Sequence, residues 1–300
     1  MALLTAASAA HLDEDLPLLV EALAALGLPP AVVDWHDEGH DWARHDLVVV
    51  RSTWDYTDHL DAFLATLRGI AAATVVANPV AVIAANVDKR YLVRLAAAGV
   101  PVVPTTVLEV GDRLEVPDGP FVVKPVVSAG ARDTERYAPE EADLARAHVA
   151  ALHAAGRAVL VQPYVSAVDD RGETGIVHLA DERSHAFRKG PILRPDATYV
   201  EGLYREEDIR PRRSTAAEEA VADAVLDAVD VVAPGATRRD LLYARVDLVP
   251  GPDGPLLMEL ELVEPSLFLD TDPGAPDRAA AAVARQLPDG RLEDGSREQV

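Results

Sequence analysis

Acidic side chains and one arginine lie along two apolar segments near the end of this 300-residue chain. Residues 243–250 and 255–262 are rich in strand-forming residues, and the Pro and Gly residues at 250–255 predict a turn between them. Side chains alternate between the two faces of a strand, so Arg245 and Asp247 share a face, together with Tyr243 and Val249. The sequence therefore predicts a hairpin whose first strand presents a guanidinium and a carboxylate on the same side.

The second predicted strand adds two more carboxylates. Strict alternation places Glu259 and Glu261 on one face with Leu257, and places Leu256, Met258, Leu260 and Leu262 on the apolar face. Asp247 then lies across from both glutamates, and carboxylates that close repel unless positive charge lies among them. Mg²⁺ suits such a set, because it takes one or two carboxylates and fills its other positions with phosphate oxygens. Arg245 could hold a phosphate bidentately. A solvated face with scattered charge is the alternative.

The bulk composition limits the classes of function. The chain is 49% hydrophobic, which allows a substantial core, and it has a formal net charge of -22, which argues against a nucleic-acid or anionic-membrane surface. Cysteine is absent, so disulfides and thiolate metal sites are excluded. The first residues lack the basic region of a secretory signal, and no apolar run is long enough to span a bilayer. We expect a cytoplasmic protein.

The first 85 residues alternate strand-like and helix-like segments. Strands are expected at 2–6, 31–34, 46–51 and 74–78, with a helix at 11–26, and this order predicts a small doubly wound domain. In such sheets ligands bind beyond the carboxyl ends of the strands.

Polar and aromatic residues follow the buried strand at 46–51. Arg51, Ser52, Thr53, Trp54 and Asp55 offer one guanidinium, hydroxyls and an aromatic wall, which would suit a small substrate carrying a carboxylate. The alternative is a helix N-cap formed by Ser52 or Thr53, with Trp54 packed on the surface. Both interpretations stay open.

The middle of the chain places three lysines near the ends of predicted elements. Lys89 lies in a helix expected at 87–98, Lys124 ends a strand at 121–125, and Lys189 ends a strand that begins near 184. The small residues at 128–131 could let backbone N–H groups approach phosphate oxygens, although they form no known phosphate-loop motif. Further helices are expected at 142–155, 216–231 and 279–287, and the tail from 289 to 300 is expected to be disordered.

These residues fall in an order that resembles the ATP-grasp superfamily of carboxylate–amine ligases, over about residues 86–285. The segments at 51–56, 122–131 and 258–269 further resemble one branch, which includes the O-ureido-serine cyclo-ligases that form D-cycloserine. The resemblance implies an α/β fold with an N-terminal substrate domain (1–85) and two ATP-grasp subdomains (86–163 and 164–288). It also implies ATP and Mg²⁺ as cofactors, and a small amino-acid-like substrate. Formation of a homodimer is left open.

The resemblance also implies roles for individual residues. Two departures concern Glu261, where the superfamily usually has Asn, and Gln162, where it usually has Glu; Asp169, Asp170 and Glu173 are the candidates for the ribose contact. The implied catalytic residues are Arg245, Lys189 and Ser128. The implied nucleotide-binding residues are Lys89, Lys124, Ser128, Ala129, Gly130, Gln162, Tyr164, Val165, Glu173 and Lys189. The implied metal ligands are Asp247, Glu259 and Glu261, and the implied substrate residues are Arg51, Ser52, Thr53, Trp54, Asp55 and His185.

The implied chemistry is ATP-dependent activation of a carboxylate as an acyl phosphate, followed by attack of a nitrogen to form an amide. We expect that nitrogen to lie on the same molecule, because the segment 51–56 contains no second basic residue for another amino acid. A two-substrate ligase resembling D-alanine–D-alanine ligase or glutathione synthetase is the first alternative, and a non-catalytic nucleotide-binding module is the second. His185 is a further candidate for the cleft, although a lone histidine is more often structural.

Overall fold

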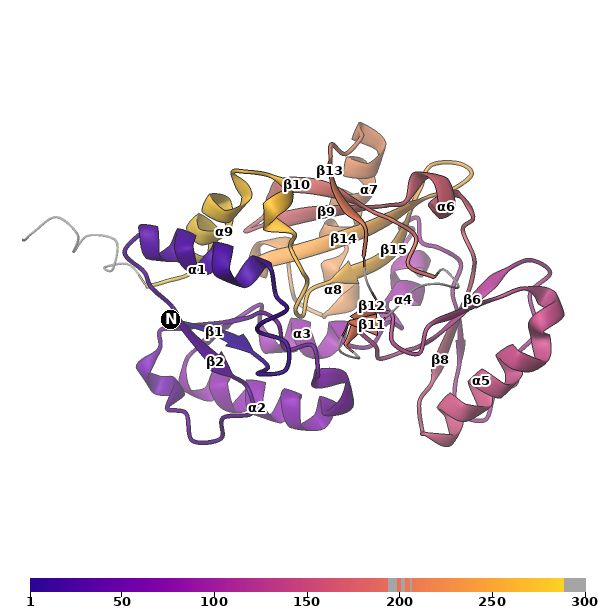
Figure 1. Ribbon diagram of the computed structural model, residues 1–300, viewed down its shortest axis with the longest axis horizontal. Coiled ribbons are helices and arrows are strands. Elements are labelled where there is room, and N and C mark those ends of the chain that lie inside the picture. The colour runs from indigo at the N-terminus through magenta and orange to yellow at the C-terminus, as the bar shows by residue number, and fades with distance from the viewer. Residues whose placement is uncertain (194–198, 201–202, 206, 289–300) are drawn as a thin grey trace, which may run out of the picture.

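A computed structural model describes residues 1–193, 199–200, 203–205 and 207–288. The expectation of a disordered tail at 289–300 therefore concerns residues outside the described part. The described residues form a mixed α/β protein built on three main sheets (Figure 1). None of the described helices is long and apolar enough to cross a membrane.

The first sheet is parallel and has the strand order β2-β1-β3-β4. Its strands are β1 (Ala2–Thr5), β2 (Ala31–Asp34), β3 (Leu47–Val50) and β4 (Val75–Ala77). The strands β1 and β3 are entirely buried, as expected for parallel strands covered on both faces. Helices α1 (Asp15–Ala25), α2 (Leu60–Ala73) and α3 (Val80–Asn86) accompany this sheet. The β-α-β order and the doubly wound arrangement predicted from the sequence are thus confirmed.

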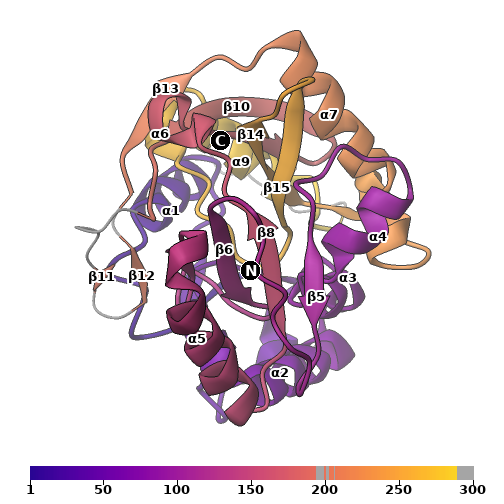
Figure 2. The ribbon, with the colours of Figure 1, turned by 90° about the vertical axis from the view of Figure 1, so that its right-hand side faces the viewer.

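The second sheet is antiparallel, with the strand order β5-β8-β6-β7. Its strands are β5 (Thr106–Leu108), β6 (Phe121–Pro125), β7 (Glu135–Tyr137) and β8 (Val159–Pro163). Helix α5 (Ala142–Ala154) packs on it through a cluster that contains Ala145, Val149 and Leu152. Figure 2 views this sheet with α5 beside it and the larger sheet above.

The largest sheet is antiparallel, with the strand order β13-β10-β9-β14-β15. Its strands are β9 (Glu173–Leu179), β10 (Glu182–Lys189), β13 (Ile209–Arg212), β14 (Tyr243–Pro250) and β15 (Pro255–Glu261). Helices α4 (Tyr91–Ala97), α6 (Ala167–Arg171), α7 (Ala216–Asp227), α8 (Val229–Val232) and α9 (Ala275–Ala284) surround it, and β11 (Tyr199–Val200) pairs with β12 (Tyr204–Arg205) beside it. Helix α9 packs against α1, which joins the last helix to the first domain (Figure 1).

Side-chain amides fasten β14 and β15 to the rest of the chain. The amide of Asn78 donates to the main-chain oxygens of Tyr243 and Leu262, both at 2.9 Å, and its oxygen accepts from the N–H of Leu242. The amide of Asn86 likewise donates to the main-chain oxygen of Leu260, and its oxygen accepts from the N–H of Leu262. The hairpin is thus held by two buried amides, one just before helix α3 and one at its end, which restricts its position relative to the first sheet.

Two predicted helices differ in the structure. Lys89 lies in the turn before α4 rather than inside a helix, because the Asp88 carboxylate accepts the N–H of Arg90 and the Lys89 N–H bonds the oxygen of Val126. The segment 216–231 is divided at Ala228 into α7 and α8. These helix boundaries depend on local side-chain hydrogen bonds and on tertiary contacts, which cannot be predicted from the spacing of hydrophobic residues.

Candidate active site

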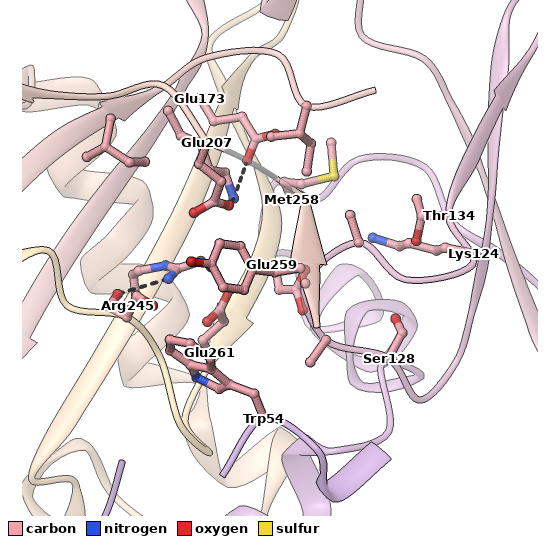
Figure 3. A pocket seen from close by; sticks show the side chains of 18 of the residues that line it. Trp54, Lys124, Ser128, Thr134, Glu173, Glu207, Arg245, Met258, Glu259 and Glu261 are labelled. Carbon is pink, nitrogen blue, oxygen red and sulfur yellow. Dashed lines mark hydrogen bonds and ion pairs between the residues drawn. The ribbon is translucent and has the colours of Figure 1, made fainter. Parts of the chain in front are cut away.

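A cavity of about 610 Å³ lies where the three sheets converge. Its lining includes most of the residues expected to bind nucleotide, and Figure 3 shows Lys124, Ser128 and Thr134 across the cavity from Glu173, Glu259 and Glu261. The expected residues that line it are Trp54, Lys89, Lys124, Ser128, Ala129, Gly130, Gln162, Tyr164, Val165, Glu173, Lys189, Arg245, Glu259 and Glu261. Residues far apart in the sequence therefore line the same cavity.

The hairpin pairs Asp247 with Glu259, as expected, whereas Glu261 pairs with Arg245. The pairing shifts between Asp247 and Leu248, so that Leu248 pairs with Leu257 and Met258 is the extra residue of a bulge. Leu257 consequently joins the core, and Met258 lines the cavity beside Glu259 and Glu261. The strict alternation predicted for residues 256–258 was wrong, because a bulge inserts one residue and exchanges the faces beyond it.

Asp247 is buried behind two cations. Its carboxylate accepts from the Arg245 guanidinium at 2.8–3.2 Å and lies 3.4 Å from the Lys189 ammonium. Burial opposes ionisation of Asp247, but Arg245 and Lys189 outweigh it and hold the pKa of this carboxyl below its usual value. Asp247 itself does not line the cavity. Its carboxylate therefore orients the two cations that do.

Lys189 is surrounded by carboxylates. Its ammonium lies 3.4 Å from Glu173 and 3.7 Å from Glu207, in addition to Asp247. Burial lowers the pKa of Lys189, but these three carboxylates more than offset the effect, and its pKa lies well above the usual value. The three carboxylates therefore favour the charged form of Lys189.

Arg245 connects the hairpin to the segment that follows it. Its guanidinium bonds Glu261 as well as Asp247, and it donates to the main-chain oxygen of Ser266 at 2.9 Å. Burial raises the pKa of Glu261 to about 8, and the neighbouring Asp247 and Glu259 add to this rise while Arg245 opposes it. The carboxyl of Glu261 would thus be favoured in its ionised form by any further positive charge in the cavity.

The opposite wall carries the other two lysines. The Lys89 ammonium lies 3.1 Å from Glu259 and also donates to the main-chain oxygen of Ser128. The Lys124 ammonium makes no hydrogen bond or ion pair with a described residue, although the residue is buried and lines the cavity. Burial lowers the pKa of Lys124, and Glu259 partly restores it. An anionic group in the cavity would relieve the desolvation of this ammonium.

The donor set of the hairpin fits a magnesium ion bound largely through another ligand. No three Asp, Glu or His side chains of the described residues are gathered as a metal cage, because Asp247 is enclosed by Arg245 and Lys189. Glu259 and Glu261 nevertheless face the cavity together. Mg²⁺ commonly takes one or two carboxylates and completes its shell with phosphate oxygens and water. These two glutamates are the residues that could hold it.

The strand β8 leads to the end of the cavity assigned to the base of the nucleotide. Gln162 is buried and donates to the Thr105 hydroxyl at 2.8 Å. Tyr164 bonds Asp169, and the Arg136 guanidinium lies 3.6 Å from the centre of its ring. The carboxylate of Glu173, by contrast, is bound to Lys189, and burial raises its pKa. Of the three candidates for the ribose contact, Glu173 lines the cavity.

The loop of small residues closes one side of the cavity against two other units. A side chain at Gly130, where φ is +60°, would meet the Leu203 oxygen at 2.4 Å. Next to this contact, Arg132 holds both carboxylate oxygens of Asp58 at 2.9–3.0 Å. The rings of Trp54 and Tyr204 meet edge to face at 5.4 Å. Parts of all three units therefore meet over the cavity.

The remaining residues expected to bind substrate do not line the cavity. Arg51, Ser52 and Thr53 are buried behind its wall, and Asp55 bonds Trp35 and His36 within the first domain. His185 donates from Nε2 to the Leu267 oxygen at 2.7 Å, which is the structural role considered in the sequence. Sequence spacing could not show this, because the contacts of Arg51 and His185 join residues far apart in the sequence.

The segment 263–269, which follows β15, formed part of the family resemblance, but its residues were assigned no role from the sequence. Side chains bond four successive carbonyls of this segment, at distances of 2.8–3.4 Å. The pairs are Tyr243 with Val263, Trp54 with Glu264, Arg51 with Pro265, and Arg245 with Ser266. The Asp15 carboxylate then accepts the N–H groups of Leu267, Phe268 and Leu269 at 2.5–3.1 Å. The segment is thus fixed from both the first domain and the hairpin.

Comparisons with known proteins agree with this architecture. The family model for the N-terminal domain of the D-cycloserine synthetase DcsG matches residues 1–78. The cycloserine biosynthesis protein DcsG of Streptomyces lavendulae is 40% identical over 300 residues, which cover 96% of this chain and 98% of that protein.

Solved structures give the same result. The crystal structure of D-cycloserine synthetase DcsG matches with a TM-score of 0.86 and 36% identity, over 96% of this chain and 99% of that one. The ATP-grasp ligase PsnB, in complex with a phosphomimetic precursor variant, Mg and ADP, matches with a TM-score of 0.59 and 20% identity over 95% and 97%. The expected ATP-grasp fold is confirmed, and the chain belongs to the D-cycloserine synthetase family.

Proposed function

We propose that this ATP-dependent ligase activates the carboxylate of O-ureido-D-serine and closes the molecule to D-cycloserine. Its family membership supports the reaction class. The observation that carries the proposal is that Lys124, Lys189 and Arg245 face the same cavity as Glu259 and Glu261. Such a cavity can hold a triphosphate and a small acid side by side.

The reaction requires three bond exchanges. A carboxylate oxygen attacks the γ-phosphorus of ATP, the bond to ADP breaks, and an acyl phosphate forms. The ureido nitrogen that is bonded to oxygen then attacks the acyl carbon, and inorganic phosphate leaves. Loss of the carbamoyl group from the ring nitrogen consumes one water and releases carbon dioxide and ammonia. Proximity favours the ring closure, because the nucleophile and the acyl carbon belong to one molecule.

Charged side chains would promote the phosphoryl transfer mainly by positioning the reactants and by offsetting the negative charge of the transferring phosphoryl group. Lys124 has no partner in the described part of the chain and would bind a phosphate oxygen. Lys189 and Arg245, held by Asp247, would face the transferring group from the other side. A magnesium ion held by Glu259 and Glu261 would neutralise phosphate charge when bound. Contacts at Gly130 would keep water from the acyl phosphate.

The test uses one substrate at a time. Enzyme, ATP, Mg²⁺ and O-ureido-D-serine are incubated, ADP release is followed, and the products are identified by mass spectrometry. We expect D-cycloserine and ADP in equal amounts. If ADP appears only after a second amino acid is added, and the product is a linear amide, the chain is a two-substrate ligase. If a nucleotide binds but no carboxylate stimulates ADP release, the chain is a binding module.

A further inference from the structure

Glu264 is a buried carboxyl at the cavity wall that has no cationic partner in the described part of the chain. Its side chain lines the cavity, and the residue is only 8% exposed. The other buried carboxylates at this site each lie beside a cation: Glu259 beside Lys89, Asp247 and Glu261 beside Arg245, Glu173 beside Lys189, and Asp15 beside Arg51. A buried carboxylate is costly unless it is paired. Glu264 therefore lacks the positive charge that its neighbours have.

The position of Glu264 is fixed by its main chain. The Trp54 indole donates to the Glu264 oxygen at 3.4 Å, and the next carbonyl, that of Pro265, accepts from Arg51 at 3.1 Å. On the other side, the Val263 oxygen accepts from the Tyr243 hydroxyl at 2.8 Å. Three successive peptide units are thus bound by side chains, of which those of Arg51 and Tyr243 are buried and that of Trp54 is half-buried. Such a carboxyl is well placed to recognise a ligand, because little of its freedom remains to be lost on binding.

The surroundings of the Glu264 carboxyl favour a compact cation. Trp54 and Tyr56 line the cavity together with Glu264. Burial raises the pKa of Glu264 to about 7, although Lys89, Tyr56 and Arg245 act in the opposite direction. Asp13 and Asp15, which also line this region, are already bound to Arg51 and to backbone N–H groups. Of these three described carboxyls, Glu264 is the one without an ion pair, whereas Asp13, whose Oδ2 accepts no hydrogen bond, lies 4.0 Å from Arg51.

The geometry points to Glu264 as the group that binds the α-ammonium of the substrate. This inference rests on the proposed function, in which the substrate is an amino acid. Its carboxylate must approach the hairpin cations, and its ammonium lies only one carbon away from that carboxylate. Glu264 follows Glu261, the last residue of β15, by three positions, and it lines the same cavity as Arg245 and Lys189. A substrate whose carboxylate faces these two cations would therefore have Glu264 in the same cavity to receive its ammonium. The substrate would supply the missing cation.

The test compares two ligands and three variants. The ligands are O-ureido-D-serine and its deaminated analogue, 3-(ureidooxy)propanoate, which keeps the carboxylate and the ureido group. The variants are Glu264→Gln, which keeps the shape but removes the charge, Glu264→Asp, which keeps the charge, and Glu14→Gln. Glu14 is an exposed carboxylate at the rim of the same cavity and serves as the matched control. Binding is measured by calorimetry with Mg²⁺ and a non-hydrolysable ATP analogue, and steady-state kinetics are measured in parallel.

We expect Glu264→Gln to weaken binding of O-ureido-D-serine about 10- to 100-fold, the usual range for a lost charge-assisted bond. Binding of the deaminated analogue and the KM for ATP should be unchanged, Glu264→Asp should restore part of the affinity, and Glu14→Gln should resemble the wild type. Equal weakening of both ligands by Glu264→Gln would overturn the inference, and so would equal affinity of the wild type for both.

These outcomes separate the inference from the proposed function. If the wild type forms no D-cycloserine but still prefers the aminated ligand in a Glu264-dependent manner, the reaction is wrong and the ammonium site stands. If D-cycloserine forms and Glu264→Gln affects both ligands alike, the reaction stands and the site is wrong. Failure of O-ureido-D-serine to bind the wild type rejects the site as well.

Discussion

The guanidinium of Arg51 donates a hydrogen bond to the main-chain oxygen of Pro265, 214 residues later in the chain. The same guanidinium lies 3.4 Å from the Asp15 carboxylate, which in turn accepts three backbone N–H groups from residues 267–269. Arg51 is only 2% exposed and does not reach the cavity. Arg51, directly after strand β3, therefore positions the segment that carries Glu264 and does not itself contact the substrate.

Replacing Arg51 should reduce both stability and substrate binding. Arg51→Met leaves Asp13 and Asp15 buried without their cation, and breaking a buried pair in this way costs about 3–5 kcal/mol. We expect a lower midpoint of thermal unfolding and a higher KM for O-ureido-D-serine, with little change in the KM for ATP. A variant that loses substrate binding at an unchanged unfolding midpoint would instead indicate direct contact with the substrate.

Lys124 and Lys189 should respond differently to replacement by alanine. Lys124→Ala removes a desolvated ammonium that has no partner among the described residues, so the free energy of unfolding should stay the same or rise. The KM for ATP should increase at least 10-fold, which corresponds to a loss of about 1.4 kcal/mol of binding free energy. Lys189→Ala leaves Glu173, Glu207 and Asp247 without their shared cation and should destabilise the fold. Urea unfolding and ATP saturation curves measure both. Equal KM changes for ATP and for the carboxylate substrate would remove Lys124 from the nucleotide site.

Glu259→Gln should abolish ADP production while the protein stays folded. The substitution keeps the shape of a partly exposed side chain but removes one of the two carboxylates that face the cavity. It also removes the anion beside Lys89. Because the lost carboxylate is itself a proposed magnesium ligand, increasing the Mg²⁺ concentration should restore little activity. ADP release and circular dichroism are the measurements, and turnover at the wild-type rate would exclude Glu259 as a metal ligand.

Sequence reasoning succeeded where the chemistry is local. The pairing of Asp247 with Glu259 could be predicted because both segments are rich in strand-forming residues and are joined by a turn of Pro and Gly. The bulge at Met258 could not be predicted, because the extra residue is accommodated by the core around Leu257 and by the bonds of the Leu257 main chain to Pro101 and Val103.

The role of Arg51 depends on contacts that no local pattern reports. The end of a buried strand was a sound place to expect a functional residue, but the partner of Arg51 lies more than 200 residues away. Glu264 was missed for the same reason. Its signal in the sequence was an acidic residue directly before Pro265, three positions after the hairpin, and only burial without a cation distinguishes it from an ordinary surface glutamate.

Gly130→Ala should uncouple ATP consumption from product formation. The added methyl group would meet the Leu203 oxygen and the Tyr204 backbone at 2.4–2.7 Å, and the residue has a positive φ of +60°. The units over the cavity could then not approach as closely, and water would hydrolyse the acyl phosphate. We expect the ratio of ADP to D-cycloserine to rise above one. Gly69→Ala in α2, where nothing lies within 4 Å of the new methyl group, is the control and should keep the ratio at one.

His178 should make the stability of the protein depend on pH. The residue is 3% exposed on β9, and both ring nitrogens lack a hydrogen-bond partner in the described part of the chain. Burial lowers its pKa from 6.5 to about 4. As the pH falls below 6.5, the unfolded chain takes up the proton first, so the folded state loses stability between pH 6.5 and 4, by up to about 3 kcal/mol.

The variant His178→Leu isolates this contribution, because Leu has no titrating group and suits an apolar site. Urea unfolding of both proteins at several pH values gives two profiles, and the other titrating groups cancel in their difference. The wild type should lose stability relative to His178→Leu as the pH is lowered from 7 to 4.5, whereas the difference should be constant above pH 7.5. Parallel profiles over the whole range would mean that His178 finds a partner for its proton, and that its burial does not keep it neutral.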